Sequence, residues 1–456
     1  MSQTPLWVIP ETWQWSTFGD IATVVGGGTP KTGESVNWAG GSVPWITPAD
    51  LSGYHEKLIS HGARSITVAG LENSSARLMP AGTLLMSSRA PVGYAAIAAQ
   101  PLATNQGFKN FVLKGDLFSD YFYYYVLGQR ELLLKFASGT TFLEVSGKNA
   151  ARIPVPIPPL AEQRRIVAAI EEHLSRLDAA VAALERIRAA LPRYRAAVLK
   201  AACDGRLCNG SKARGELRPL GDFLEAIEAG KSFKCEERVP TREEVGVVKV
   251  SAVTWGEFDE DESKTVRDST RVDPRYFIRA GDFLFSRANT IQLVGTCVIA
   301  KRVTRRLMLS DKILRLKLRG IPPGWALICL RSPLGRSEIE RLATGNQESM
   351  RNIGQDRIRQ IRIPALSPSD IDTTLAEVDR RLSLADAAER AVSAGLAKAK
   401  RLRQAILKRA FEGKLIPQDP NDEPASVLLE RIRAARASAA PATRARQDRR
   451  RKAAKK

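Results

Sequence analysis

The chain has 456 residues and a formal net charge of +21 at pH 7. This length allows two or three domains with proper cores, and the basic balance favours a polyanionic partner such as nucleic acid or an anionic membrane surface. Five cysteines without a CxxC pair argue against a disulfide framework or structural zinc; with no signal peptide and no long apolar run, they predict a cytoplasmic protein with reduced thiols.

The first 155 residues are expected to form a strand-rich domain. Short apolar runs between Gly, Pro and Asn signals predict strands at 42–46, 82–87, 94–98 and 107–113. A helical pattern over 118–136 is interleaved with these runs. The mixture favours the α+β class over a sandwich.

A long helix is predicted within residues 156–203. Pro158 and Pro159 can occupy a first helical turn, and residues 161–202 lack glycine and place apolar side chains about 3.6 residues apart. Gly205 is expected to end the helix. Pro192 is expected to kink the helix or split it in two.

The second half of the chain follows the same order. Strands are predicted at 245–253, 282–286, 293–299 and 313–318, within a second domain over 204–365. A second long helix is predicted over 366–415, with Ser367 as its N-cap. Residues 416–456 are a basic C-terminal tail expected to be partly disordered, because the last 26 residues hold eleven Lys or Arg and a single acid.

Similar peptides occur in the same order in both halves, which predicts an internal repeat. Residues 197–207 read AVLKAACDGRL and residues 405–415 read AILKRAFEGKL, with six identities. Residues 79–89, MPAGTLLMSSR, match residues 278–287, IRAGDFLFSR. The matched helices are expected to pack on each other as an antiparallel coiled coil; the alternative is an ordinary core helix in each domain.

No catalytic motif was found. Gly230-Lys231-Ser232 resembles the end of a phosphate-binding loop, but Glu225 stands where its first glycine is needed. There is no HExxH, no HxE with CxxC, and no Asn/Asp-Pro-Pro-aromatic sequence of the base-methylating kind. With no metal site indicated either, these absences favour a binding protein.

Several peptides resemble the target recognition domains of type I restriction–modification specificity subunits. They are LMPAGT at 78–83, SSRAPVGY at 87–94, TNQGFK at 104–109, IPPLAEQ at 157–163 and FEGKL at 411–415. The similarity extends over nearly the whole chain. The second copy departs from the pattern, since residues 365–371 read ALSPSDI and Arg287 is followed by Ala-Asn-Thr.

The resemblance implies an α+β fold with two strand-rich α/β target recognition domains, joined by two long helices that form an antiparallel coiled coil with a pseudo-two-fold internal repeat. It implies that each domain reads one half of a bipartite site in double-stranded DNA and that the helices set the spacer. It also implies two methyltransferase (M) subunits and restriction/translocase (R) subunits as partners. The chain would be non-catalytic and hold no cofactor, whereas its partners would use S-adenosylmethionine, ATP and Mg²⁺.

Candidate DNA-contacting residues follow from the side chains that read base edges and phosphates. In the first half they are Arg89, Asn105, Gln106, Lys109, Lys148 and Asn149. In the second half they are Arg287, Asn289, Thr290, Lys312, Asn346, Gln347 and Arg351. For each residue, turn capping or a solvated charge is the competing interpretation. Glu162 and Gln163 are expected to serve the helix start and subunit docking.

Two other functions remain open from the sequence. The first is a coiled-coil scaffold or RNA-binding protein with two ligand-binding domains. The second is a stand-alone nuclease or methyltransferase. Selective binding of a bipartite duplex in the presence of a methyltransferase would favour the specificity subunit over both.

Overall fold

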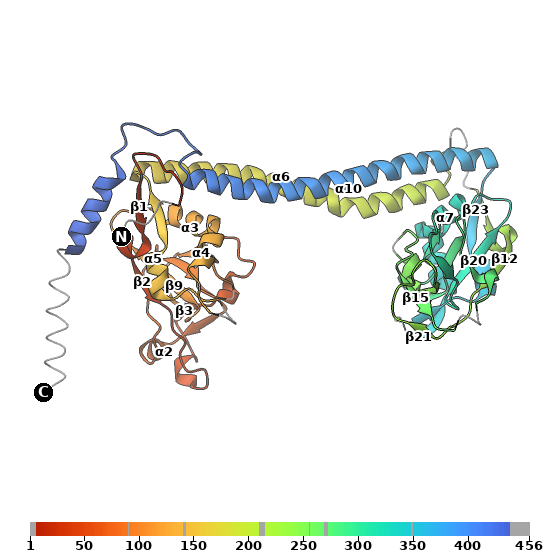
Figure 1. Cartoon of the computed structure of the whole chain (residues 1–456), viewed down its shortest axis with the longest axis horizontal. Coiled ribbons are helices and arrows are strands. Elements are labelled where there is room, and N and C mark those ends of the chain that lie inside the picture. The colour runs from red at the N-terminus through yellow and green to blue at the C-terminus, as the bar shows by residue number, and fades with distance from the viewer. Residues whose placement is uncertain are drawn as a thin grey trace. The chain divides into compact units, whose positions relative to one another are not determined.

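A computed structural model describes residues 6–89, 91–139, 143–208, 215–254, 256–268, 272–347 and 350–437. The chain divides into two compact units. Unit 1 comprises Met1–Ala182 and Leu396–Lys456, and unit 2 comprises Ala183–Gly395. The division falls inside both long helices, so each unit contains a globular part and a segment of each helix (Figure 1).

Unit 1 contains short strands and helices before the first long helix. Its strands are β1 (Gln14–Thr17), β2 (Ala22–Gly26), β3 (Val43–Ile46), β4 (Leu58–Ile59), β5 (Arg64–Ile66), β6 (Leu84–Ser87), β7 (Ala95–Ala98), β8 (Ala103–Thr104), β9 (Phe108–Leu113) and β10 (Pro154–Ile157). Its helices are α1 (Phe18–Ile21), α2 (Val68–Glu72), α3 (Ser119–Gly128), α4 (Arg130–Lys135), α5 (Gly147–Arg152) and the start of α6 (Leu160–Cys203).

Three sheets organise the described part of unit 1. The strand orders are β2-β9-β6-β7-β4, β5-β3-β8 and β1-β10. The four predicted strands are confirmed as β3, β6, β7 and β9. The predicted helix over 118–136 is two helices, because the backbone at Gln129 leaves the helical conformation (φ −115°, ψ 30°) between α3 and α4.

Unit 2 is also strand-rich. Its strands are β11 (Glu216–Pro219), β12 (Leu224–Ala229), β13 (Cys235–Glu236), β14 (Val245–Val248), β15 (Ser263–Val266), β16 (Phe283–Ser286), β17 (Ala288–Asn289), β18 (Cys297–Ile299), β19 (Arg306–Met308), β20 (Ile313–Leu318), β21 (Thr344–Gln347), β22 (Met350–Asn352) and β23 (Arg362–Ala365). Its helices are α7 (Pro323–Arg331), α8 (Pro333–Leu342), α9 (Gln355–Arg359) and the start of α10 (Pro368–Phe411).

Four sheets are present in the described part of unit 2, with the orders β12-β20-β16-β18, β13-β15-β14-β19, β17-β22-β21 and β11-β23. Several pairings match those of unit 1. The first strand of each unit pairs antiparallel with the strand before its long helix: β1 with β10, and β11 with β23. In the smaller sheets, β3 runs parallel to β8 and β14 runs parallel to β19.

Both long helices have 44 residues and the expected ends. The Ser367 hydroxyl caps α10 by accepting a hydrogen bond from the Asp370 amide at 3.2 Å. Gly205 and Gly413 follow α6 and α10 with φ of +71° and +69°, a left-handed conformation that glycine adopts at little cost. Pro192 lies inside α6, so the expectation that it could split the helix is wrong.

Aromatic side chains dominate the core of unit 1. The buried Tyr121 and Tyr125 hydroxyls donate to the carbonyls of Pro156 (2.9 Å) and Pro154 (2.6 Å), so α3 is joined to β10. The Phe411 ring, at the end of α10, packs edge-on against both tyrosines. The first and last parts of the chain thus share one core, and burial of this aromatic surface supplies much of the stability of unit 1.

The C-terminal segment was expected to begin a basic tail at residue 416, but part of it packs as core. Residues 425–437 are helical, and Ala425, Leu428, Leu429 and Ile432 are buried in the core of unit 1 (Figure 1, blue). Their spacing at i, i+3, i+4 and i+7 places all four on one helix face. Residues 438–456 lie outside the described residues.

The core of unit 2 uses the other ends of the long helices. Val198, Ala202 and Cys203 of α6 are buried in the same cluster as Ile371 and Val378 of α10. No helix in the described ranges is long and apolar enough to cross a membrane.

Candidate nucleic-acid interface

Two of the predicted cations in unit 1 converge on Glu144. Arg89 Nη1 lies 3.6 Å from Glu144 Oε2, and Lys109 Nζ lies 3.2 Å from Glu144 Oε1. Lys109 Nζ also donates to the Ser88 hydroxyl at 3.1 Å. The Val145 amide donates to the Ser88 carbonyl at 2.9 Å, which holds Glu144 beside both cations.

Lys109 and Arg89 differ in the exposed fraction of their side chains, which indicates different roles. The Lys109 side chain is only 10% exposed and lies on β9, whereas the Arg89 side chain is 38% exposed and follows β6. Lys109 is therefore placed to position its neighbours, and its predicted contact with DNA is not supported by this geometry. Arg89 keeps enough exposed surface to meet a ligand.

Asn105 and Gln106 lie in the turn between β8 and β9. The Asn105 side chain accepts a hydrogen bond from the Gly107 amide at 2.9 Å, a local turn that occupies this oxygen. Gln106 is exposed and accepts a hydrogen bond from the Thr29 hydroxyl. The Ser88 amide donates to the Gly107 carbonyl at 2.7 Å, so this turn adjoins the Arg89 cluster.

Lys148 and Asn149 also differ in their exposure and in their contacts. Both lie on α5, where Asn149 Nδ2 donates to the Phe136 carbonyl at 2.9 Å and so ties the helix to the end of α4. Lys148 is exposed at the first turn of α5. Turn capping accounts for Asn149, and Lys148 remains a predicted phosphate contact.

Unit 2 brings most of its predicted residues together. The Arg287 amide donates to the Lys312 carbonyl at 2.9 Å, and Arg287 Nε donates to Asn352 Oδ1 at 3.3 Å. Asn289 pairs with Arg351 in the β17–β22 ladder. Lys312 is exposed, and Arg287 is partly exposed. Base or phosphate contact by this group stays a prediction.

The remaining predicted residues of unit 2 have local partners or lie at a hairpin. Arg351 Nη1 donates to the Gly345 carbonyl at 2.8 Å, and the Thr290 amide donates to Asn289 Oδ1 at 2.8 Å. Gln347 is exposed at the end of β21. Asn346 belongs to β21, but its side chain lies outside what the structure describes.

The predicted docking role of Glu162 and Gln163 requires correction. The two residues are 1% and 0% exposed, so neither offers atoms to a partner. Glu162 Oε2 accepts a hydrogen bond from the Trp13 indole at 2.9 Å, and Gln163 Oε1 accepts one from the Phe118 amide at 3.2 Å. Both side chains instead attach the start of α6 to the globular part of unit 1.

The burial of Glu162 shifts the pKa of its carboxyl group. Desolvation raises the pKa of its carboxyl above the ordinary value, although the Trp13 hydrogen bond and the charge of Arg165 act in the opposite direction. Among the described residues, no group donates a hydrogen bond to its buried Oε1 atom. Burial therefore favours the neutral, protonated form of the Glu162 carboxyl over the charged form.

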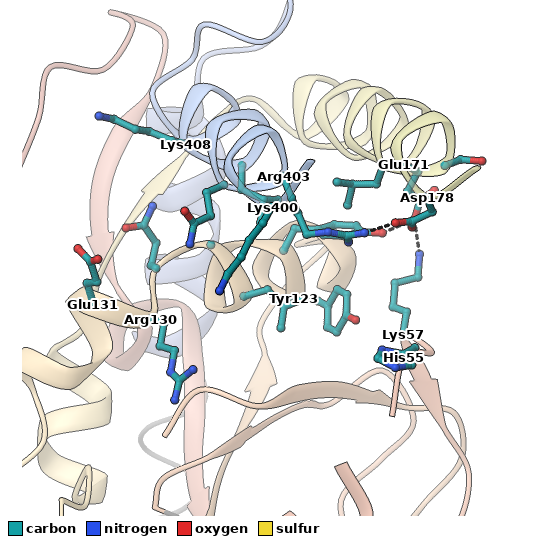
Figure 2. Close-up of a pocket in the computed structure, with 18 of the residues that line it drawn as sticks. His55, Lys57, Tyr123, Arg130, Glu131, Glu171, Asp178, Lys400, Arg403 and Lys408 are labelled. Atoms are coloured by element: carbon teal, nitrogen blue, oxygen red, sulfur yellow. Dashed lines mark hydrogen bonds and ion pairs between the residues drawn. The ribbon is translucent and has the colours of Figure 1, made fainter. Parts of the chain in front are cut away.

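A cavity of about 1100 Å³ lies in unit 1, beside α3, α6 and α10; Figure 2 shows residues that line it. Lys57 pairs with Glu171 at 2.7 Å and also with Asp120, while Arg403 pairs with Asp178. Arg130, Lys400 and Lys408 add positive charge to the lining. No group of His, Cys, Asp or Glu within the described ranges is arranged to hold a metal ion. The lining is a mixed set of ion pairs without a nucleophile–base arrangement.

Comparisons with known proteins match the family suggested by the sequence. Residues 10–192 match the family described as the type I restriction modification DNA specificity domain. The chain is 25% identical to the EcoKI specificity subunit of Escherichia coli strain K12, over 94% of this chain and 97% of that protein. The chain is therefore similar to type I restriction enzyme specificity subunits, by the domain match over residues 10–192 and by a likeness over nearly its whole length. The MjaIX specificity subunit of Methanocaldococcus jannaschii is 42% identical, over 36% of this chain and 38% of that protein.

Solved structures of specificity subunits share the fold. The HsdS subunit from Thermoanaerobacter tengcongensis matches with a TM-score of 0.59 at 17% identity, over 90% of this chain and 99% of that chain. A chain from a structure on complex assembly and conformational transition of the type I R-M system matches with a TM-score of 0.64 at 18% identity, over 90% of this chain and all of that chain. Both likenesses support an α+β fold with long helices.

The specificity-domain match places the Arg89 cluster inside the family region. Residues 10–192 include β1 to β10 and most of α6. Sequence reasoning identified Arg89 and Lys109 but missed Glu144, which holds both. No sequence signal could have identified Glu144, because an acid is not expected beside a polyanion and the residue lies 35 positions from Lys109.

Proposed function

We propose that the chain is the DNA-recognition subunit of a type I restriction–modification complex, in which each unit reads one half of a bipartite DNA site. The observation that carries this proposal is the recurrence of one strand-pairing scheme. The order β2-β9-β6-β7 in unit 1 has its counterpart in β12-β20-β16-β18 in unit 2, and a 44-residue helix follows each. Two similar scaffolds in one chain suit a target with two parts.

The side chains carried by these scaffolds differ. Unit 1 presents Arg89 and Gln106, and unit 2 presents Arg287 and Lys312 with the β21–β22 hairpin. Because base edges are distinguished by specific donor and acceptor patterns, different side chains read different sequences. The proposal therefore includes an asymmetric site whose two halves differ in sequence.

The long helices are proposed to set the number of base pairs between the half-sites. Two observations in unit 2 support an antiparallel pair. Arg195 of α6 pairs with Asp386 (2.6 Å) and Glu389 (2.7 Å) of α10, and the end of α6 shares a core with the start of α10. Within unit 1, Arg403 of α10 pairs with Asp178 of α6. We propose that these contacts belong to one antiparallel coiled coil with a pseudo-two-fold repeat.

Partner subunits would supply the chemistry. We propose that two methyltransferase subunits dock on exposed positions of the helix pair and that restriction/translocase subunits complete the complex. Glu162 and Gln163 are excluded from direct docking by their burial. S-adenosylmethionine, ATP and Mg²⁺ are assigned to the partners, and the role of this chain is recognition rather than catalysis.

Genome-wide mapping of methylated bases tests the proposal. The full chain would be produced with its methyltransferase partner in a host that lacks other adenine and cytosine methylation. The expected motif has two specified halves separated by an unspecified gap. Arg89→Ala should alter preference only in one half, and Lys312→Ala only in the other. A contiguous motif, or variants that each alter both halves, would contradict the proposal.

A further inference from the structure

In unit 1, Arg64 stacks on an aromatic platform formed by Trp38 and Trp45. The guanidinium carbon of Arg64, on β5, lies 3.7 Å from the centre of the Trp38 ring and 5.8 Å from the Trp45 ring. The two indoles meet edge to face, with centroids 5.1 Å apart and an interplanar angle of 82°. Stacking of this kind holds the planar guanidinium in one orientation.

Hydrogen bonds fix both indoles of the platform. Trp45 is 3% exposed, and its Nε1 donates to the Gly28 carbonyl at 2.9 Å. Trp38 Nε1 donates to the Lys31 carbonyl at 3.0 Å. Arg64 itself pairs with Trp45 in the β3–β5 ladder. The orientation of Arg64 is therefore fixed by the pairing of β5 with β3, by the buried Trp45 indole and by the hydrogen bond that holds Trp38.

The donors of Arg64 have no acceptor within the part of the chain that the structure describes. The residue is exposed, and among the residues that the structure describes its side chain makes neither an ion pair nor a hydrogen bond. Arg89 and Lys109 differ, because both contact Glu144. An arginine held by stacking, with its donors unused, is ready to bind an external acceptor.

The Arg64 platform adjoins the turn that carries Gln106. The Gly28 amide donates to the Thr104 carbonyl at 2.9 Å, and the next residue, Thr29, donates its hydroxyl to Gln106. Gly28 also accepts the Trp45 indole hydrogen bond. One loop thus links the platform to a predicted base reader.

Unit 2 lacks this arrangement at the matching sheet position. In β14–β15, Val247 pairs with Lys264 as Trp45 pairs with Arg64 in β3–β5. An aliphatic side chain replaces the indole there, and Lys264 forms an ion pair with Glu237. Unit 2 has arginines over Phe223 and Phe277, at 5.2 and 5.5 Å from the ring centres, but not at this sheet position. A stacked arginine at this position therefore differs between the units, as expected for a feature that reads only one half of an asymmetric site.

We propose that Arg64, held against Trp38, reads a guanine in the half-site recognised by unit 1; this inference rests on the proposed DNA-recognition function. An oriented guanidinium can donate two parallel hydrogen bonds to O6 and N7 of guanine in the major groove. The guanidinium fork can also bind a phosphate bidentately, but a phosphate contact carries no sequence information. Because the stacked arginine is replaced at the matching sheet position of unit 2, a base edge that differs between the half-sites is the favoured partner.

Selection from a random duplex library tests this inference, with the full chain and its methyltransferase partner as the bait. Arg64→Ala should lose the guanine preference at one position of one half-site and weaken binding of the selected duplex about 5- to 100-fold. Arg64→Lys retains the charge without the planar fork and should lose the same preference. Trp38→Leu should do so as well, because it removes the stacking face.

A matched control is Arg130→Ala, which removes one exposed positive charge from unit 1 at a residue that lines the cavity in Figure 2. It should leave every base preference unchanged. The preference of the second half-site should persist in all variants and so reports that each one is folded.

Three results would overturn the inference. The first is a base preference in Arg64→Ala identical to that of the parent chain. The second is a uniform loss of affinity across all sequences with a shallower salt dependence, which identifies a phosphate contact. The third is a parent complex that selects no bipartite site, and this alone would also overturn the proposed function.

Discussion

At the scale of single residues, the cations of unit 1 depend on an acid for their positions. Lys109 is nearly buried and has Glu144 and the Ser88 hydroxyl as its polar side-chain partners. A buried ammonium group without a counter-charge is costly. Glu144 therefore has a structural role beside a surface that is proposed to bind DNA.

Glu144→Gln should lower the free energy of unfolding by about 1–2 kcal/mol, because Lys109 loses its counter-charge in a partly buried site. Denaturant unfolding of the full chain measures this. Glu34→Gln is the matched control, since Glu34 pairs with Lys31 at the surface (46% and 81% exposed), and it should cost less than about 0.5 kcal/mol. Equal effects of the two substitutions would refute the structural role of Glu144.

Glu162 predicts a pH dependence. Its pKa in the folded chain is raised above the ordinary value of 4.5, so the folded state binds the proton more tightly than the unfolded state. Its contribution to stability is therefore full below the unfolded pKa and is lost as pH rises through the folded pKa. Glu162→Gln, which cannot ionise, should gain stability relative to the parent chain as pH rises from about 4.

Unfolding free energies measured across this pH range for both chains test the Glu162 prediction. Glu172→Gln is the control, because Glu172 lies on the same helix but is exposed and pairs with Arg176 at 2.5 Å. It should not change the shape of the profile. Parallel pH profiles for the parent chain and Glu162→Gln would show that the buried carboxyl does not titrate as described.

At the scale of secondary-structure elements, much of the fold could be predicted from the sequence. The apolar runs that became β6 and β9 and the 3.6-residue spacing in α6 are local signals. The break between α3 and α4 at Gln129 was missed, although Gly128 directly before it is a local signal for the end of a helix. A glycine inside a helical pattern is also tolerated, so this signal alone did not divide the predicted helix.

The C-terminal helical segment was missed for a different reason. Its high content of arginine was interpreted as a tail, although Leu428, Leu429 and Ile432 lie on one face and are buried. The charged residues occupy the other faces of the same helix. Net charge therefore concealed an amphipathic pattern within residues 425–437.

Leu429→Ala should destabilise unit 1 by about 2–4 kcal/mol, because a side chain that is 3% exposed would leave a cavity. Val427→Ala, at a position that is 38% exposed, should cost less than about 1 kcal/mol. Thermal or denaturant unfolding of the full chain distinguishes them. If both variants unfold like the parent chain, the segment does not belong to the core.

At the scale of the whole molecule, motif peptides carried the resemblance to specificity subunits and repeated peptides suggested the proposed duplication, but the interface was only partly accessible from the sequence. Arg89, Gln106, Arg287 and Lys312 were chosen by residue type and lie at exposed or partly exposed positions. Glu162 and Gln163 serve the helix start as predicted, but their docking role was wrong, because a motif shows that residues matter without showing what they contact. The Arg64–Trp38 stack could not be seen in the sequence, since the two residues are 26 positions apart and come together only through the pairing of β3 with β5.

The central claim is that one chain joins two readers of different sequence through helices that set their spacing on DNA. Inserting four residues after Ala189 in α6 and four after Ala391 in α10 lengthens both helices by about 6 Å, close to two base pairs. These positions keep the register defined by Arg195 with Asp386 and Glu389.

Methylated bases would be mapped for the parent and the lengthened chain with the same methyltransferase. We predict that the gap grows by about two base pairs while both half-sites stay the same. Altered half-sites with an unchanged gap would contradict the claim.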